Sequence, residues 1–150
     1  MRQFYVVSDK FRKYPKKEIK LPTRATQNSA GYDFYSPDNF IINSKSFAII
    51  ATDVKVNMCG DEFLQIIPRS SIGIKKNLML KNTIGLIDSD YFENEDNDGN
   101  IIIALYNYGS EKVEIKEGER IAQGIFCEYG ITVDDKPLTI LRKGGIGSSN

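Results

Sequence analysis

Short apolar segments separated by turn residues recur along the chain, and this pattern constrains the fold more than any other feature. Several segments alternate apolar and polar residues, and none carries an apolar stripe at helical spacing over several turns. Such spacing is typical of a β-sandwich, jelly roll or barrel. The expected strands are Gln3–Val7, Phe40–Ile42, Phe47–Ala51, Phe63–Ile67, Leu78–Leu80, Ile101–Tyr106, Lys112–Ile115, Ile121–Phe126 and Leu138–Leu141.

A single short helix interrupts this pattern. Ser70 and Ser71 are predicted to cap a helical turn through Ile72–Lys76, because serine hydroxyls accept hydrogen bonds from the first amides of a helix. The chain has 150 residues, which predicts one domain with a buried core.

The charge balance excludes several classes of partner. Twenty basic and twenty acidic residues cancel, so there is no net field that would attract nucleic acid or a membrane surface. No apolar run is long enough to span a bilayer, and the first residues lack the apolar stretch of a signal peptide. Cys59 and Cys127 are expected to be buried free thiols. We therefore expect a soluble intracellular protein, located in a cytoplasm or host-cell cytoplasm.

The candidate chemistry centres on a carboxylate, because the sequence contains no histidine. Asp88 follows two apolar residues in Gly85–Tyr91 and is the best-placed candidate general base. Upstream, Pro68–Ser71 offers a guanidinium group, two hydroxyls and backbone amides, which suit a phosphate. The glycine-rich end of the chain offers further amides and hydroxyls for a polyphosphate. Each segment alone is weak, since turns and disordered ends have similar compositions.

The order of five segments strengthens this interpretation. In sequence order they resemble the five motifs of the trimeric dUTPase family, and they cover most of the chain. The segments are Ala30–Phe34, Pro68–Gly73, Asn82–Tyr91, Gly118–Gln123 and Arg142–Ser149. The chain is identified as a member of this family, and its departures from the usual pattern suggest a divergent phage- or virus-like member.

The resemblance implies an all-β jelly roll or β-barrel and a homotrimer whose active sites are shared between subunits. The implied reaction is hydrolysis of dUTP to dUMP and pyrophosphate by in-line attack of a water on the α-phosphorus. Asp88 would activate that water, and Tyr91 would lie against the deoxyribose. The residues implied to receive uracil are Asn82, Gly85, Leu86 and Ile87.

The same resemblance assigns the phosphates and a metal. Mg²⁺ would bridge the triphosphate oxygens, with Asp33 contacting it through water. The phosphates would be contacted by Arg69, Ser70, Ser71 and Gln123. The implied division is a β domain over residues 1–141 and a flexible glycine-rich arm over residues 142–150 that completes an active site. The arm residues implied to cover the substrate are Arg142, Ile146, Gly147, Ser148 and Ser149, where Ile146 replaces the usual phenylalanine lid.

An insert follows the third motif and has no counterpart in the usual pattern. Glu93–Asp98 is predicted to be a solvated acidic hairpin tip. Two other interpretations remain open, a calcium loop and a protein-binding site. A calcium loop is disfavoured because its last ligand would fall on Leu105.

Two other functions compete with hydrolysis. The related dCTP deaminases need a glutamate in the strand after the hairpin, and the matching residue here is Ala104, which cannot carry a proton. A dUTP-binding regulatory protein that acts through a partner is the other alternative. All the residues that hydrolysis needs are present, so dUTP hydrolysis is the expected activity.

Overall fold

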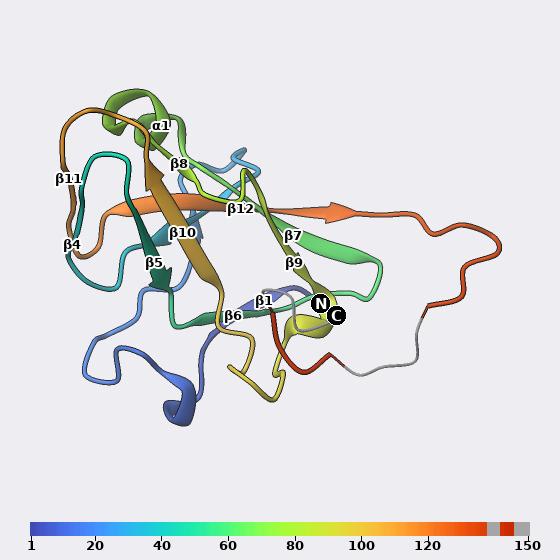
Figure 1. The fold of residues 1–150 in the computed structure, drawn as a ribbon. Helices are drawn as coiled ribbons and strands as arrows, with labels where there is room; N and C mark the ends of the chain where they lie inside the picture. Colours follow the sequence, from blue (N-terminus) through green and yellow to red (C-terminus); the bar gives the residue numbers. More distant parts are fainter. Residues whose placement is uncertain (138–141, 146–150) are drawn as a thin grey trace.

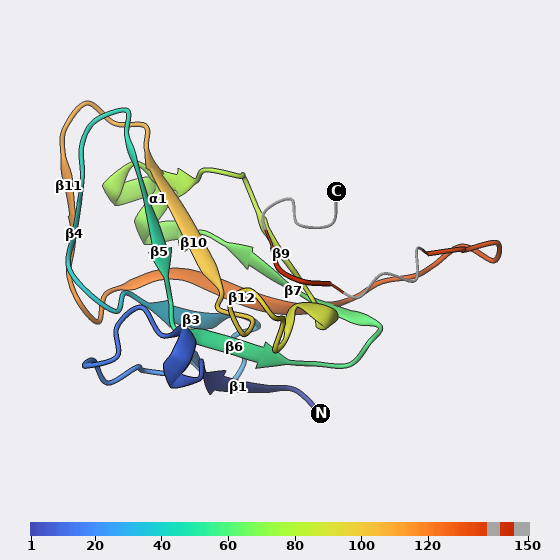
Figure 2. The same ribbon diagram turned by 60° about the horizontal axis from the view of Figure 1, so that its bottom comes forward.

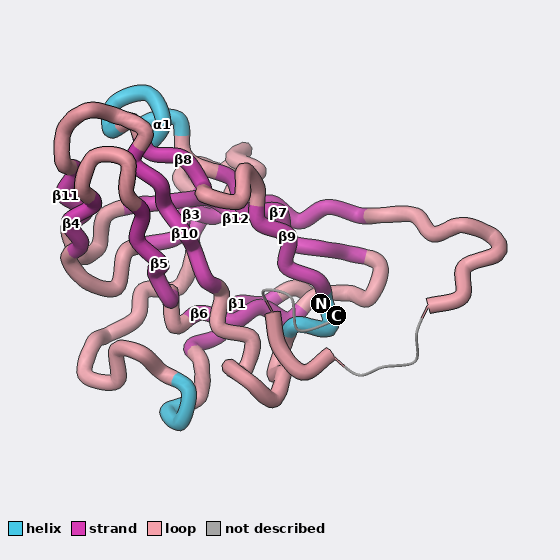
Figure 3. Tube along the Cα trace, in the orientation of Figure 1, coloured by secondary structure: helices cyan, strands magenta, loops and turns pink. Residues whose placement is uncertain are grey.

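A computed structural model describes residues 1–137 and 142–145 of the chain. Strands dominate it, with one short α-helix and two 3₁₀ turns (Figure 3). The strands are β1 (Gln3–Val6), β2 (Thr23–Arg24), β3 (Tyr32–Tyr35), β4 (Phe40–Ile42), β5 (Phe47–Ala51), β6 (Val54–Asn57), β7 (Glu62–Ile67), β8 (Leu78–Leu80), β9 (Gly85–Asp88), β10 (Ile102–Asn107), β11 (Val113–Ile115) and β12 (Arg120–Glu128). The helical segments are η1 (Asp9–Phe11), α1 (Ser70–Lys76) and η2 (Ser89–Tyr91).

In the described part of the chain, four antiparallel sheets enclose one core. The largest has five strands in the order β2-β3-β12-β7-β9, and a second has three in the order β5-β10-β8. Two further pairs, β1-β6 and β11-β4, complete the body (Figure 1). Residues 129–137, which follow β12, extend away from this body in both ribbon views (Figure 2). The expected all-β architecture is confirmed.

Side chains from all four of these sheets pack in the core. Phe34 of β3, Leu64 of β7, Leu105 of β10 and Ile121 of β12 are at most 1% exposed, and they belong to one contiguous hydrophobic cluster. Burying a large apolar side chain stabilises a fold by roughly 1.5–3 kcal/mol. This shared cluster therefore fixes the sheets relative to one another.

Most of the expected strands are confirmed. Three have the expected bounds, namely β4, β5 and β8, and five others differ by one or two residues at their ends. Four strands were missed: β2, β3, β6 and β9. Of these, β3 and β6 each carry a charged residue that is buried, Asp33 and Lys55 respectively. The ninth expected strand, Leu138–Leu141, lies outside the described residues.

Two details correct the sequence analysis. Helix α1 begins at Ser70, and its N-cap is Arg69, whose carbonyl accepts the amides of Ile72 and Gly73 at 3.0 and 3.1 Å. The serines therefore lie inside the first turn and do not cap it. The two cysteines are free thiols but not buried. Cys59 is exposed in the turn between β6 and β7, and Cys127 is half-buried near the end of β12.

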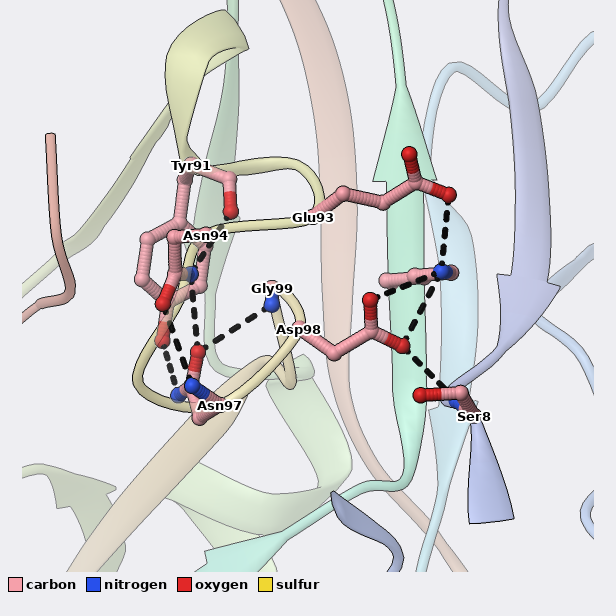
Figure 4. A network of polar contacts seen from close by, with 8 residues as sticks. Ser8, Tyr91, Glu93, Asn94, Asn97, Asp98 and Gly99 are labelled. Carbon is pink, nitrogen blue, oxygen red and sulfur yellow. Dashed lines mark hydrogen bonds and ion pairs between the residues drawn. The ribbon is translucent and has the colours of Figure 1, made fainter. Parts of the chain in front are cut away.

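The insert is packed onto the body, which corrects the prediction of a solvated tip. Glu95 and Asp96 are exposed, but Asp98 is buried. Its carboxylate accepts the backbone amide of Ser8 at 2.7 Å (Figure 4). Both of its oxygens lie 3.0 Å from the ammonium of Lys55 on β6. A buried lysine needs such a partner, so the insert and β6 hold each other in place.

The helices of the structure are short. Within residues 1–137 and 142–145, no helix has the length and hydropathy that crossing a bilayer requires.

Asp98→Asn should lower the free energy of unfolding at neutral pH. It should also make that free energy less sensitive to a fall in pH. Burial opposes ionisation of Asp98, but the Ser8 amide and the Lys55 ammonium outweigh it and hold its pKa below the usual value. A depressed folded-state pKa stabilises the protein above the unfolded pKa of about 3.9, and this contribution is lost as pH falls through the folded pKa. We expect a loss of about 1–3 kcal/mol at pH 7 and a smaller further loss on acidification than in wild type.

Urea unfolding at neutral pH and over the acid range measures both effects. Glu95→Gln is the matched control, because Glu95 is exposed in the same insert. Equal acid dependence in Asp98→Asn and wild type would contradict the stabilising role of this carboxylate.

Candidate active site

Asp88 lies at the end of edge strand β9, where the chain turns into η2. Strand β9 pairs with β7, and Asp88 faces Phe63 in that register. The close approach of β9 to β7 depends on Gly85, because a Cβ atom there would lie 2.9 Å from the Cβ of Ile66. The side chain of Asp88 is 45% exposed. It is therefore reachable by a water molecule and a substrate.

The residues predicted to receive uracil surround one cavity beside β9. The cavity has a volume of about 690 Å³, within the usual range for small-molecule sites. Its wall is mostly apolar, and Tyr91 contributes to it. The lining residues are Phe47, Ile49, Lys81, Asn82, Gly85, Leu86, Ile87, Tyr91, Ile102, Ala104, Arg142 and Gly145. The structure thus brings Asn82, Gly85, Leu86, Ile87 and Tyr91 together.

The start of the predicted arm rests on this same hairpin. Arg142 forms ion pairs with Asp88 and with Asp90, the latter at 2.7 Å from its Nε. The carbonyl of Lys143 accepts the amide of Asp96 at 2.9 Å. Gly145 lies against the ring of Tyr91, where a Cβ atom would be 2.9 Å from a ring carbon. The guanidinium expected to contact phosphate therefore contacts carboxylates of its own chain.

A second polar cluster lies on the neighbouring strands. Gln123 of β12 faces Asp33 of β3 on one side and Ile67 of β7 on the other. Asp33 is 4% exposed, and its oxygens lie 2.8 Å from Nε of Arg69 and 3.3 Å from a terminal nitrogen of Arg120. The predicted phosphate contacts Arg69 and Gln123 are therefore neighbours. Ser70 is exposed and Ser71 half-buried at the start of α1.

Strand β7 separates the two clusters within one chain. Asp88 pairs with Phe63 near the start of β7, whereas Arg69 follows Ile67 at its end. The four residue steps from Phe63 to Ile67 alone span about 13 Å. Arg69 therefore cannot reach a phosphate whose phosphorus is attacked by a water on Asp88 of the same chain.

The acidic side chains fit a metal ion that arrives with a substrate. Among the described residues, no group of three or more histidine, cysteine, aspartate or glutamate side chains is arranged to hold an ion. Both oxygens of Asp33 take part in ion pairs with arginines. Mg²⁺ is commonly held by one or two carboxylates and by substrate phosphates while it keeps several waters. Asp33 fits a contact through such a water better than a direct ligand.

Sequence reasoning missed several lining residues. Phe47 and Ile49 of β5, and Ile102 of β10, lie in the cavity wall although their strands were predicted. Phe47 and Ile49 lie on the outward face of β5 and are 43% and 60% exposed. Large apolar side chains on the exposed face of a strand are the feature that could have indicated a binding surface. Arg120 lies in the fourth motif, Gly118–Gln123, but the sequence analysis gave it no role. The predicted residues Ile146, Gly147, Ser148 and Ser149 lie outside the described part of the chain.

Comparison with known proteins gives a consistent result. The sequence model of the dUTPase family matches residues 17–150. The deoxyuridine 5'-triphosphate nucleotidohydrolase of Lactococcus lactis is 36% identical over 99% of this chain and 97% of its own length. The crystal structure of the Streptococcus mutans dUTPase superimposes with a TM-score of 0.76, at 32% identity, over 86% of this chain and 97% of that one.

A more distant structure shares the fold. A mutant form of the dUTPase from phage phi11 of S. aureus is 20% identical, with a TM-score of 0.69 over 93% of this chain and 97% of that one. That protein coordinates a structural Mg(II) ion.

Gly85→Ala should destabilise the protein by about 1–3 kcal/mol, because the new methyl group would overlap Ile66 and push β9 away from β7. The measurement is the free energy of unfolding in urea. Gly60→Ala is the matched control, since nothing lies within 4 Å of a Cβ atom at that glycine. Equal stability of the two variants would show that β9 tolerates a larger separation from β7.

Proposed function

Since this chain belongs to the dUTPase family and is a dUTP diphosphatase, we propose that Asp88 activates the water that attacks the α-phosphorus of dUTP. The water oxygen forms a bond to that phosphorus, and its proton passes to the carboxylate of Asp88. The bond from the α-phosphorus to the bridging oxygen breaks in line. The products are dUMP and pyrophosphate. Asp88 is accessible, and its neighbour in the sequence, Ile87, lines the cavity, which supports this role.

The cavity beside β9 is the proposed site for uracil and deoxyribose. Among the described strands, β9 stands at the edge of the five-stranded sheet. Its outward backbone groups are therefore available to pair with the edge of a base, as in other edge strands. Gly85–Ile87 supply these groups, and Asn82 supports them. A methyl group on the base would clash in a tight pocket, which disfavours thymine. Tyr91 lies against the sugar and leaves no room for a 2′-hydroxyl.

We propose that the phosphates are bound by the other cluster, from a second subunit of a homotrimer. The separation of Arg69 and Asp88 along β7 carries this part of the proposal, because one subunit cannot supply both ends of the site. Arg69, Ser70, Ser71 and Gln123 contact the phosphates. The arm of a third subunit closes the site, with Arg142, Ser148 and Ser149 on the terminal phosphates, Gly147 giving close backbone approach and Ile146 covering the base. This arrangement requires Arg142 to leave the ion pairs that it forms with Asp88 and Asp90 of its own chain.

Magnesium enters this proposal with the substrate. When bound, Mg²⁺ would supply charge neutralisation to the triphosphate, and Asp33 would hold the ion through a water. The chain's own residues position the substrate and hold the attacking water. Positioning and charge neutralisation dominate phosphoryl transfer, so the absence of histidine from the sequence is no obstacle.

The alternative reactions have less support. Ala104 lines the cavity, and its methyl group cannot carry the proton that deamination of dCTP requires. A regulatory role through a protein partner at Glu93–Asp98 stays a prediction, and the packing of the insert against Lys55 and Ser8 gives that segment a role within its own chain.

The proposed activity is tested by pyrophosphate release from dUTP, dTTP, dCTP and UTP in the presence of Mg²⁺. We expect release from dUTP alone in wild type. Asp88→Asn should lower kcat for dUTP by roughly 10²–10⁴-fold, the usual contribution of a general base, without a change in the unfolding midpoint beyond that of a surface variant. Near wild-type turnover in Asp88→Asn would remove Asp88 from its role.

The shared site is tested by mixing two inactive variants. Arg69→Ala and Asp88→Asn should each be nearly inactive, because each lacks one end of the site. Co-expressed in equal amounts and randomly assembled, they should restore about a quarter of the wild-type sites, since one subunit then supplies Arg69 and another Asp88. Separately purified trimers that are mixed without exchange are the control. No activity in the co-expressed sample would place both residues in one subunit's site.

A further inference from the structure

The insert Glu93–Asp98 surrounds Tyr91, the residue proposed to exclude the ribose 2′-hydroxyl. Tyr91 is 6% exposed, and it is one of the residues that line the cavity. A ring that excludes one hydroxyl group must be held to within a fraction of an ångström. The contacts that hold it therefore bear on substrate choice.

Asparagine side chains of the insert hold Tyr91 at both ends (Figure 4). The amide nitrogen of Asn97 donates to the phenol oxygen of Tyr91 at 2.6 Å. The phenol hydroxyl in turn donates to the carbonyl of Asn100 at 3.0 Å. At the other end, the amide of Asn94 donates to the carbonyl of Tyr91 at 2.8 Å. The tyrosine is thus fixed along its whole length.

The geometry of the loop fixes Asn97 itself. Its side-chain oxygen accepts hydrogen bonds from the amide of Asn94 at 2.8 Å and from the backbone of Gly99 at 3.1 Å. Gly99 has a φ of +82°, a conformation that favours glycine. A Cβ atom there would also lie 2.8 Å from the Tyr91 carbonyl. This turn therefore brings Asn97 back onto the tyrosine ring.

The insert is anchored to the body on both sides of this contact. Asp98 and Glu93 each lie 3.0 Å from the ammonium of Lys55 on β6. Asn100 exchanges hydrogen bonds with Asp53, with its amide nitrogen 2.9 Å from a carboxylate oxygen. The hydroxyl of Tyr91 is thus connected through Asn100 to Asp53, which directly precedes β6, and both of these residues are buried.

We propose that Asn97 is a positioning residue that holds Tyr91 against the sugar and so sets how strongly the enzyme rejects ribonucleotides. This inference rests on the proposed function, in which Tyr91 meets the deoxyribose. Asn97 does not line the cavity, so it acts through the tyrosine. Burial raises the pKa of Tyr91, while the Asn97 hydrogen bond and the Arg142 charge lower it by less. The phenol is therefore neutral at pH 7 and keeps its donor for Asn100.

The test compares kcat/KM for UTP with kcat/KM for dUTP in wild type and in Asn97→Ala. We expect the ratio to rise about five- to tenfold, the change that corresponds to one hydrogen bond. The change should come from UTP turnover, with little loss in dUTP turnover. Glu95→Ala is the matched control, because Glu95 is exposed in the same insert. It should keep the wild-type ratio.

A double-mutant cycle with Tyr91→Phe separates positioning from general loosening of the loop. Tyr91→Phe removes the hydroxyl that Asn97 contacts and should relax rejection of UTP on its own. In that background, Asn97→Ala should change the ratio by no more than about twofold, because coupled partners are not additive. If Asn97→Ala fails to fold, an unchanged ratio in Tyr91→Phe alone overturns the inference.

The outcomes distinguish this inference from the proposed function. A wild-type enzyme that releases no pyrophosphate from dUTP removes the proposed function and this inference with it. A selective wild-type enzyme with an unchanged ratio in Asn97→Ala removes the inference alone. An equal effect of Asn97→Ala in both backgrounds also overturns it, because Asn97 would then act without the tyrosine hydroxyl.

Discussion

The pairing of β12 with β3 on one edge and β7 on the other determines where every candidate functional group lies. Gln123 stands between Asp33 and Ile67 in this register. The arginine after β7 therefore meets the buried carboxylate of β3. The other edge of β7 carries β9, which places Asp88 at the far end of the same strand. A shift of one residue in β12 would turn each of its side chains to the opposite face of the sheet.

The strands were predictable where the hydrophobic pattern alone decides them. Strands β4, β5 and β8 have the expected bounds because their buried residues are apolar. Strands β3 and β6 were missed although Tyr32–Phe34 and Val54–Val56 alternate apolar and charged residues, and the charged residue of each is buried. Asp33 is compensated by two arginines from other parts of the chain, and Lys55 by carboxylates of the insert. These partners are distant in sequence, so local patterns cannot reveal that a charged strand is buried.

In the candidate site, too, local sequence patterns predicted some features, whereas others depend on contacts that the sequence does not reveal. The motif around Asp88 could be recognised from residues that are consecutive in the chain, and the structure gathers them beside one cavity. The insert looked like a solvated tip because most of its side chains are polar. Its asparagines instead satisfy one another and the backbone of Tyr91. Side-chain amides both donate and accept, so a polar composition is equally compatible with a packed loop and with a solvated one.

The distance along β7 has a consequence for how activity arises in a cell. In the proposed arrangement, a single folded chain carries both the Asp88 cluster and the Arg69 cluster, but the two are too far apart to form one complete active site. Hydrolysis then begins only when copies meet, so at low expression the rate rises more steeply than the amount of protein. At low concentration such a protein has little hydrolytic activity, and a small increase in its concentration raises that activity disproportionately.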